Sequence, residues 1–275
     1  MVFKRVYNGT DKKKLRKIMK VVVLQSFVGK GFLGYHVQSK NIIRDNQLLI
    51  IKCMKSVKNW CNKNGYEYIL NTKDLGWNYI KFQMKKEGFV YDEDREKDLC
   101  AQRHEVCLGI DADYIIIFDT DVWVYQDFEL PEIKVGLCIS TNALPHDNMA
   151  HYSNSHFHYV RKIMHGNIYY PQGGIQFING HANKHYNEWI VNSIKSDNWP
   201  IIWDGTEQSH IYEYSRQYPE KITWLDSRYN CIPGRYLCET EEEQRNSYLI
   251  HLCGTNKRQT LNKLPFDIKE RFLKL

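Results

Sequence analysis

The stretch DYIIIFDTDVWV, residues 113 to 124, constrains the fold more than any other part of the sequence. Its apolar residues 115–118 lead directly into Asp119 and Asp121. A short apolar run bounded by polar residues is typical of a buried strand. Residues two apart on extended backbone point to the same side, so we expect both carboxylates to approach one ligand beyond the end of that strand.

Other segments indicate that strands alternate with helices along the chain. Apolar runs predict further strands at residues 20–27, 66–72, 134–140 and 173–180. Apolar residues at helical spacing predict helices at residues 41–65 and 94–109. This alternation favours an α/β fold with a mostly parallel central sheet and flanking helices. The acidic run at residues 239–245 is expected to be a solvent-exposed helix.

The composition is that of a folded soluble protein. The chain has 275 residues, 43% of them hydrophobic and 25% charged, which is enough for one large domain. The net charge of +6 is too small to argue for a nucleic-acid partner. Because we find neither a signal peptide nor an apolar run of about 18 residues, we expect a cytoplasmic protein without a transmembrane segment. The eight cysteines form no C-x-x-C pair, and several lie in apolar patterns, so we expect reduced, buried thiols.

The spacing of Asp119 and Asp121 has a direct electrostatic consequence. Two carboxylates this close repel each other in a dry site unless a cation lies between them. A hard divalent ion with oxygen ligands would remove the repulsion and leave coordination positions for phosphate oxygens. The alternative explanation of a D-x-D sequence is a strand-end turn with two solvated aspartates.

A second motif, YLIHLCGTNK at residues 248–257, lies near the C-terminus. An apolar lead is followed by His251, Gly254 and Lys257. Imidazole suits Mn²⁺ beside carboxylates, glycine permits close approach of the backbone, and lysine offers a positive charge for a diphosphate. A core histidine and a surface lysine would explain each residue separately.

Together the two motifs resemble the metal-dependent glycosyltransferases of the A-type nucleotide-sugar fold. The sequence is most similar to glycosyltransferase family eight, the galactosyltransferase and glycogenin group, in order over roughly residues 20 to 260. The resemblance implies that Asp119, Asp121 and His251 bind Mn²⁺, with Mg²⁺ as the alternative. It also implies that Lys257 contacts the donor diphosphate.

Two further segments and one arginine extend the resemblance. YPQGGIQFING, residues 170–180, is similar to the family's strand beside the sugar, and the run 207–231 aligns Glu207 and Gln208 with an Asp-Gln pair near the reacting sugar. Arg103 stands where the family has a donor-binding arginine. The catalytic residues so implied are Gln172, Asp204, Glu207 and Gln208. The donor-binding residues are Gln25, Ser26, Arg103, Gly173, Gly174, Gly254 and Lys257. Glu207 and Gln172 replace an aspartate and an asparagine of the family, which leaves the sugar open.

The resemblance implies a hexosyl- or pentosyltransferase. Its donor would be a nucleotide-diphosphate sugar, by family default a UDP-sugar, and its acceptor a hydroxyl group of a glycan or glycoprotein. It implies retention of configuration, in which the departing phosphate can take the acceptor proton. Inversion would require a carboxylate as general base, and Asp204 and Glu207 are the candidates.

One domain is expected over residues 20–275, after a basic lead-in at 1–19. We divide it into a nucleotide-binding half at 20–125, an acceptor and catalytic half at 126–260, and a C-terminal helix at 261–275. Two other functions stay open. A phosphotransferase of the haloacid-dehalogenase type also carries a strand like IIIFDTD, although near the start of its domain. A nucleotide-sugar- or carbohydrate-binding protein without catalytic activity is the other alternative.

Overall fold

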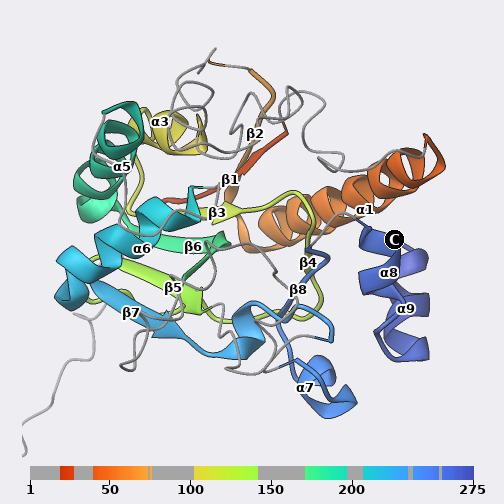
Figure 1. Ribbon diagram of the computed structural model, residues 1–275. Coiled ribbons are helices and arrows are strands. Elements are labelled where there is room, and N and C mark those ends of the chain that lie inside the picture. The colour runs from red at the N-terminus through yellow and green to blue at the C-terminus, as the bar shows by residue number, and fades with distance from the viewer. Residues whose placement is uncertain are drawn as a thin grey trace, which may run out of the picture.

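The centre of the molecule is a mixed β-sheet (Figure 1). The computed structural model describes residues 19–27, 40–73, 75, 102–141, 171–196, 207–234, 238–253 and 256–275. Within these residues the sheet has six strands in the order β2-β1-β3-β6-β5-β7. In chain order they are β1 Val21–Ser26, β2 Glu67–Asn71, β3 Tyr114–Phe118, β5 Leu137–Thr141, β6 Pro171–Asn179 and β7 Ile222–Leu225. A separate small sheet pairs β4 Val122–Val124 with β8 Leu249–His251.

Most pairings in the central sheet are parallel, as predicted. Strand β1 is parallel to both β2 and β3, and β5 is parallel to β7. Strand β6 is antiparallel to both of its neighbours, β3 and β5. The sequence predicted the presence of β6 but not its direction.

Helices cover both faces of the sheet (Figure 1). The α-helices of the described residues are α1 Lys40–Asn64, α3 Gln102–Leu108, α5 Gly180–Lys195, α6 Gln208–Gln217, α7 Glu241–Arg245, α8 Lys257–Leu261 and α9 Phe266–Leu273. Only α3, the second half of the helix predicted at 94–109, falls within the described residues. Helix α7 confirms the helix expected in the acidic run, and a capping box of Thr240 and Glu243 fixes its start.

The side chains of β3 pack on the two faces of the sheet alternately. Ile115 and Ile117 belong to a cluster with Tyr186 and Ile190 of α5, while Ile116 and Phe118 pack in a cluster with Trp60 of α1. All five residues of β3 are buried. This burial on both faces explains why the strand reads as a continuous apolar run instead of an alternating one.

A third apolar cluster joins distant parts of the chain. Trp123 of β4, Ile250 of β8 and Leu49 of α1 pack with residues of α8 and α9, including Leu261 and Phe272. Figure 1 shows α8 and α9 beside α1 at one end of the molecule. This packing fixes the C-terminal motif next to the D-x-D stretch.

The cysteines follow the prediction only in part. Cys53, Cys61, Cys107 and Cys138 are buried free thiols, as expected. Cys231 and Cys238 form a disulfide, with their Cα atoms 5.3 Å apart, so the expectation of a fully reduced chain is wrong for this pair. Among the described residues, none of the helices combines the length and apolarity needed to cross a membrane.

Candidate active site

The two aspartates follow the end of β3, where the backbone is tied on both sides. The Asp119 N–H donates to the carbonyl of Gly174 on β6 at 2.7 Å, and Gln25 Nε2 of β1 donates to the Asp119 carbonyl at 2.8 Å. Antiparallel pairing of β4 with β8 sets Val122 opposite His251. The end of β8 therefore meets the end of β3.

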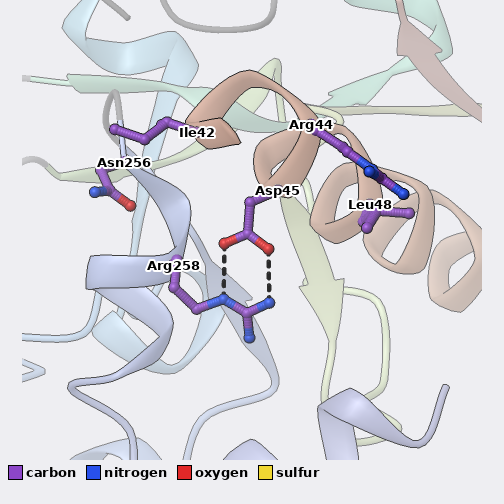
Figure 2. Close-up of a pocket in the computed structure, with 6 residues that line it drawn as sticks. All are labelled: Ile42, Arg44, Asp45, Leu48, Asn256 and Arg258. Atoms are coloured by element: carbon purple, nitrogen blue, oxygen red, sulfur yellow. Dashed lines mark hydrogen bonds and ion pairs between the residues drawn. The ribbon is translucent and has the colours of Figure 1, made fainter. Parts of the chain in front are cut away.

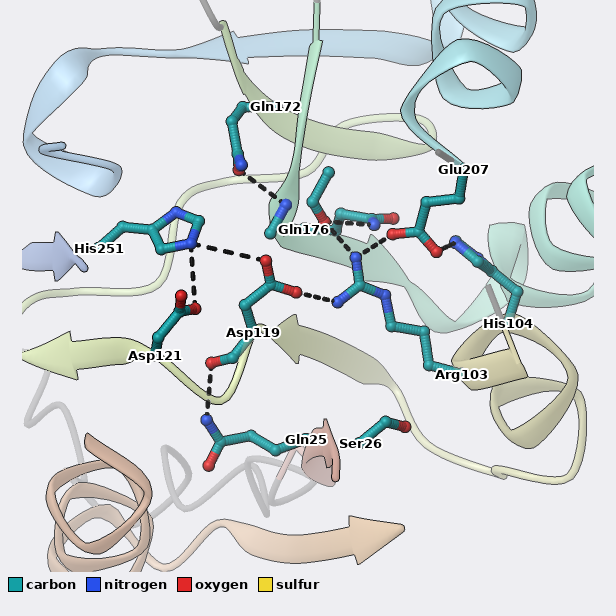
Figure 3. A network of polar contacts seen from close by, with 12 residues as sticks. Gln25, Ser26, Arg103, His104, Asp119, Asp121, Gln172, Gln176, Glu207 and His251 are labelled. Atoms are coloured by element: carbon teal, nitrogen blue, oxygen red, sulfur yellow. Dashed lines mark hydrogen bonds and ion pairs between the residues drawn. The ribbon is translucent and has the colours of Figure 1, made fainter. Parts of the chain in front are cut away.

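His251 lies against both aspartates (Figure 3). Its Nε2 is 3.1 Å from Asp121 Oδ1 and 3.5 Å from Asp119 Oδ2. One ligand atom from each of the three residues lies within 4.8 Å of the other two, so the three residues could hold a metal ion. His251 and Asp121 are buried, and Asp119 is partly exposed.

The second carboxylate oxygen of each aspartate forms an ion pair with a basic side chain of the protein. Asp119 Oδ1 pairs with Arg103, and Asp121 Oδ2 pairs with Lys257. Burial raises the pKa of Asp121, but the positive charge of Lys257 and the contact with His251 lower this pKa by more, so the carboxyl is ionised at neutral pH. Burial lowers the pKa of Lys257, and Asp121 more than reverses this, so the amine stays charged.

The aspartate oxygens that do not pair with Arg103 or Lys257 show whether these residues fit a divalent cation. Asp121 Oδ1 is buried and receives no hydrogen bond of ordinary geometry within the described part of the chain, although His251 Nε2 is close. A buried carboxylate oxygen without a donor is costly unless a ligand satisfies it. Two carboxylate oxygens and one imidazole nitrogen are a donor set that suits Mn²⁺ or a similar ion. The residues therefore fit the metal that the sequence predicted.

Arg103 connects this cluster to Glu207. Its guanidinium pairs with Asp119 and with Glu207 Oε1, and it donates to the carbonyl of Gly173 at 2.7 Å. Glu207 Oε2 lies 3.3 Å from His104 Nε2. Burial raises the pKa of Glu207, but Arg103 and His104 lower it more. Glu207 is thus an ionised, buried carboxylate that holds Arg103 in place.

Strand β6 passes unusually close to the aspartates at Gly174. A Cβ atom there would lie 2.5 Å from Asp119 Oδ2 and 2.6 Å from His251 Cε1. Real Cβ atoms essentially never make such contacts, so a side chain at this position would displace the cluster. Beside it, Gln172 Oε1 accepts a hydrogen bond from Gly174 N at 2.7 Å.

The structure brings most of the predicted site residues into one network. They are Arg103, Asp119, Asp121, Gln172, Gly173, Gly174, Glu207, His251 and Lys257. Asp204 and Gly254 lie outside the described residues, and of Gln208 only the backbone is described, at the start of α6. The functional roles assigned to all these residues stay predictions.

Gln25 and Ser26 make contacts within the protein. Gln25 is fully buried; besides its bond to Asp119, its Oε1 accepts from the Tyr68 hydroxyl at 2.9 Å. Ser26 Oγ accepts from Asn71 Nδ2 at 3.4 Å. The predicted contact of either side chain with a nucleotide stays a prediction.

Sequence reasoning missed two residues of the network, His104 and Asn230. His104 supports Glu207, and Asn230 Oδ1 lies 3.1 Å from His251 Nδ1. Asn230 ends the SRYN segment within the run 207–231, so its position in that match was the available signal. His104 directly follows Arg103 and carries no signal of its own.

A pocket of about 480 Å³ lies between the start of α1 and α8 (Figure 2). It is lined by Ile42, Arg44, Asp45, Leu48, Asn256 and Arg258. Arg258 donates to both oxygens of Asp45, at 2.7 and 2.8 Å. This pair ties α8 to α1, and so helps to hold Lys257, the first residue of α8, at the cluster.

The fold is the A-type glycosyltransferase fold. The structure is similar to a glycosyltransferase involved in glycosylation of the major capsid of PBCV-1, with a TM-score of 0.53 and 15% identity, covering 93% of this chain and 100% of that one. It is also similar to the galactosyltransferase LgtC solved with donor and acceptor sugar analogues, with a TM-score of 0.51 and 14% identity over 92% and 94% of the two chains. No protein-family model matches the sequence, and no curated protein matches it. The similarity of this chain to these proteins is therefore a similarity of fold.

The phosphotransferase alternative does not agree with this fold. It requires the D-x-D strand near the start of its domain, whereas β1, α1 and β2 precede β3 here and belong to the same packed unit. The neighbours reported above are glycosyltransferases.

Proposed function

We propose that the protein is a metal-dependent glycosyltransferase. It moves a sugar from a nucleotide-diphosphate donor, a UDP-sugar, to a hydroxyl group of a glycan or glycoprotein acceptor. The observation that carries the proposal is the meeting of Asp119, Asp121 and His251 on a fold shared with glycosyltransferases. Mn²⁺ is the proposed metal, since its ligands would be two carboxylates and an imidazole.

Charge placed around the cluster supports a diphosphate ligand. When bound, the cation would stabilise the negative charge that develops on the departing diphosphate. Lys257 would add a positive charge on the Asp121 side, and Arg103 would add one on the Asp119 side. In our proposal Gln172, Gly173 and Gly174 border the sugar, because β6 carries them past the aspartates.

Retention of configuration is the stereochemistry that we propose. A general base works best when its pKa lies near the working pH, whereas Arg103 and His104 hold the pKa of Glu207 below its usual range. A carboxylate already committed to Arg103 is a poor base for an acceptor hydroxyl, which argues against inversion through Glu207. Proton NMR of the first-formed product should show the anomeric configuration of the donor; an inverted linkage would refute this part of the proposal.

A thermal-shift screen of nucleotide-sugars tests the proposed donor. We expect the melting temperature to rise by about 5 °C when the correct donor and Mn²⁺ are both present at about 100 times the dissociation constant. The rise follows because a ligand that binds only the native state stabilises it by mass action. Differential scanning fluorimetry with each donor, with and without Mn²⁺, measures the effect.

EDTA and uridine monophosphate provide the controls. Chelation should remove the shift caused by the donor, and the monophosphate should give little shift because it lacks the second phosphate. An equal shift in EDTA would contradict the metal site. A full shift with neither hydrolysis nor transfer of the sugar would favour the binding protein over the enzyme.

A further inference from the structure

A chain of amide groups leads from the backbone of β6 to the imidazole of His251. Gly174 N donates to Gln172 Oε1 at 2.7 Å, and Asn230 Nδ2 donates to the same oxygen at 3.3 Å. Asn230 Oδ1 then lies 3.1 Å from His251 Nδ1. Gln172, Asn230 and His251 are all buried, at 7%, 8% and 1% exposure, so water contributes little to these contacts.

The direction of each bond in this chain follows from its first member. A backbone N–H can only donate, so the Gln172 atom facing Gly174 must be its carbonyl oxygen. The Asn230 atom facing that oxygen must be its amino group, because two carbonyl oxygens would repel. The remaining Asn230 oxygen therefore faces Nδ1, which must carry a proton to make the bond.

We infer that Asn230 is a positioning residue that fixes the tautomer of His251. With Nδ1 bonded to Asn230, Nε2 is the ring nitrogen that faces the aspartates, 3.1 Å from Asp121 Oδ1 and 3.5 Å from Asp119 Oδ2, and it can offer its lone pair to a cation bound there. Hydrogen bonding of one ring nitrogen decides which nitrogen is free to bind a metal. The functional part of this inference, tighter metal binding, rests on the function proposed above; the tautomer itself does not.

The backbone next to Asn230 holds the amide at this place. Cys231 N donates to the carbonyl of Leu249 at 3.0 Å, and the Cys231 carbonyl accepts from His251 N at 2.8 Å. Asn230 N in turn donates to the Ser227 carbonyl at 3.1 Å, which closes a short 3₁₀ turn. These bonds tie the segment to β8, so Asn230 and His251 keep a fixed separation.

The substitution Asn230→Leu tests the inference, because leucine has a similar size and makes no hydrogen bond. We expect the affinity for Mn²⁺ to fall by about 10- to 100-fold, as measured by electron paramagnetic resonance of free Mn²⁺. In the metal-free wild-type protein, ¹⁵N-histidine NMR should show a proton on His251 Nδ1. The His251 signal is identified as the one lost in His251→Gln. In Asn230→Leu, part of the population should shift to the Nε2–H form.

Asn187→Leu is the matched control. Asn187 is also buried and contacts an imidazole, with its Oδ1 2.6 Å from His104 Nδ1, but it does not touch His251. Asn187→Leu should leave the Mn²⁺ affinity within about threefold of the wild type. This change is much smaller than the loss expected when an outer-shell contact of the metal is removed.

Two results would overturn the inference: a wild-type His251 that carries no proton on Nδ1, or Mn²⁺ binding by Asn230→Leu as tight as by the wild type. The first measurement does not require that Asn230→Leu fold. Absence of Mn²⁺ binding by the wild type would instead refute the proposed function, while the NMR experiment would still decide the tautomer.

Discussion

Replacing Asp121 with asparagine is expected to abolish metal binding and to destabilise the protein at the same time. The variant loses a proposed metal ligand, so the affinity for Mn²⁺ should fall by more than about 100-fold, beyond the usual effect of an outer-shell residue. Sugar transfer should fall by about 10³-fold or more, since the cation supplies several kcal/mol at the transition state. The buried ammonium of Lys257 also loses its partner, which should cost about 3 kcal/mol of the free energy of unfolding. Isothermal titration with Mn²⁺ and urea denaturation measure the two effects.

The double variant Asp121→Asn/Lys257→Met separates the two roles of Asp121. Removing both charges leaves no uncompensated ion in the interior, so most of the lost stability should return. Metal binding should stay absent, because the carboxylate oxygen that faces His251 is still missing. A double variant that recovers Mn²⁺ affinity would show that Asp121 acts only as the partner of Lys257. That result would remove the aspartate from the metal site.

The sequence predicted five of the six strands of the central sheet and missed the short, partly exposed edge strand β7. Burial on both faces leaves the strongest signal. Strands β1 and β3 read as continuous apolar runs, and both are buried along their full length. The direction of β6 could not be predicted, since an apolar run such as GGIQFING reads the same for either orientation. Direction depends on how the chain returns to the sheet, and this is not encoded in the run itself.

The candidate metal site was predictable for a different reason. Asp119 and Asp121 are separated by one residue in a short motif, and His251 and Lys257 belong to a second motif of fixed spacing. The electrostatic argument from the sequence was incomplete, however. Arg103 and Lys257 neutralise part of the repulsion between the aspartates. The metal is indicated instead by the carboxylate oxygens that do not pair with these two cations.

The contacts of Lys257 and Glu207 could not be predicted from the sequence. Lys257 was expected to face the diphosphate, and in the structure it pairs with Asp121. Glu207 was expected at the reacting sugar, and it holds Arg103 and His104. Both contacts join residues more than a hundred positions apart. Such pairs depend on packing of the whole fold, which leaves no local pattern.

The substitution Gly174→Ala should disable the site without unfolding the protein. Its Cβ would lie 2.5 Å from Asp119 Oδ2, 2.6 Å from His251 Cε1 and 2.9 Å from Gln172 Oε1, so these side chains must move. A displacement of about 1 Å in a catalytic cluster can cost about 100-fold in rate, and we expect a loss of at least that size in sugar transfer. The affinity for Mn²⁺ should fall with it. The free energy of unfolding should drop by only about 1 to 3 kcal/mol, the usual cost of overpacking.

Gly109→Ala is the matched control for this prediction. A Cβ atom at Gly109 would lie 3.6 Å from the Val106 carbonyl oxygen, an ordinary van der Waals contact. It follows α3 and lies outside the metal cluster, so transfer and Mn²⁺ affinity should match the wild type. If Gly174→Ala also kept its Mn²⁺ affinity, the close approach of β6 to Asp119 and His251 would not matter for metal binding. The three proposed ligands would then bind the metal in a different arrangement, one with room for a side chain at position 174.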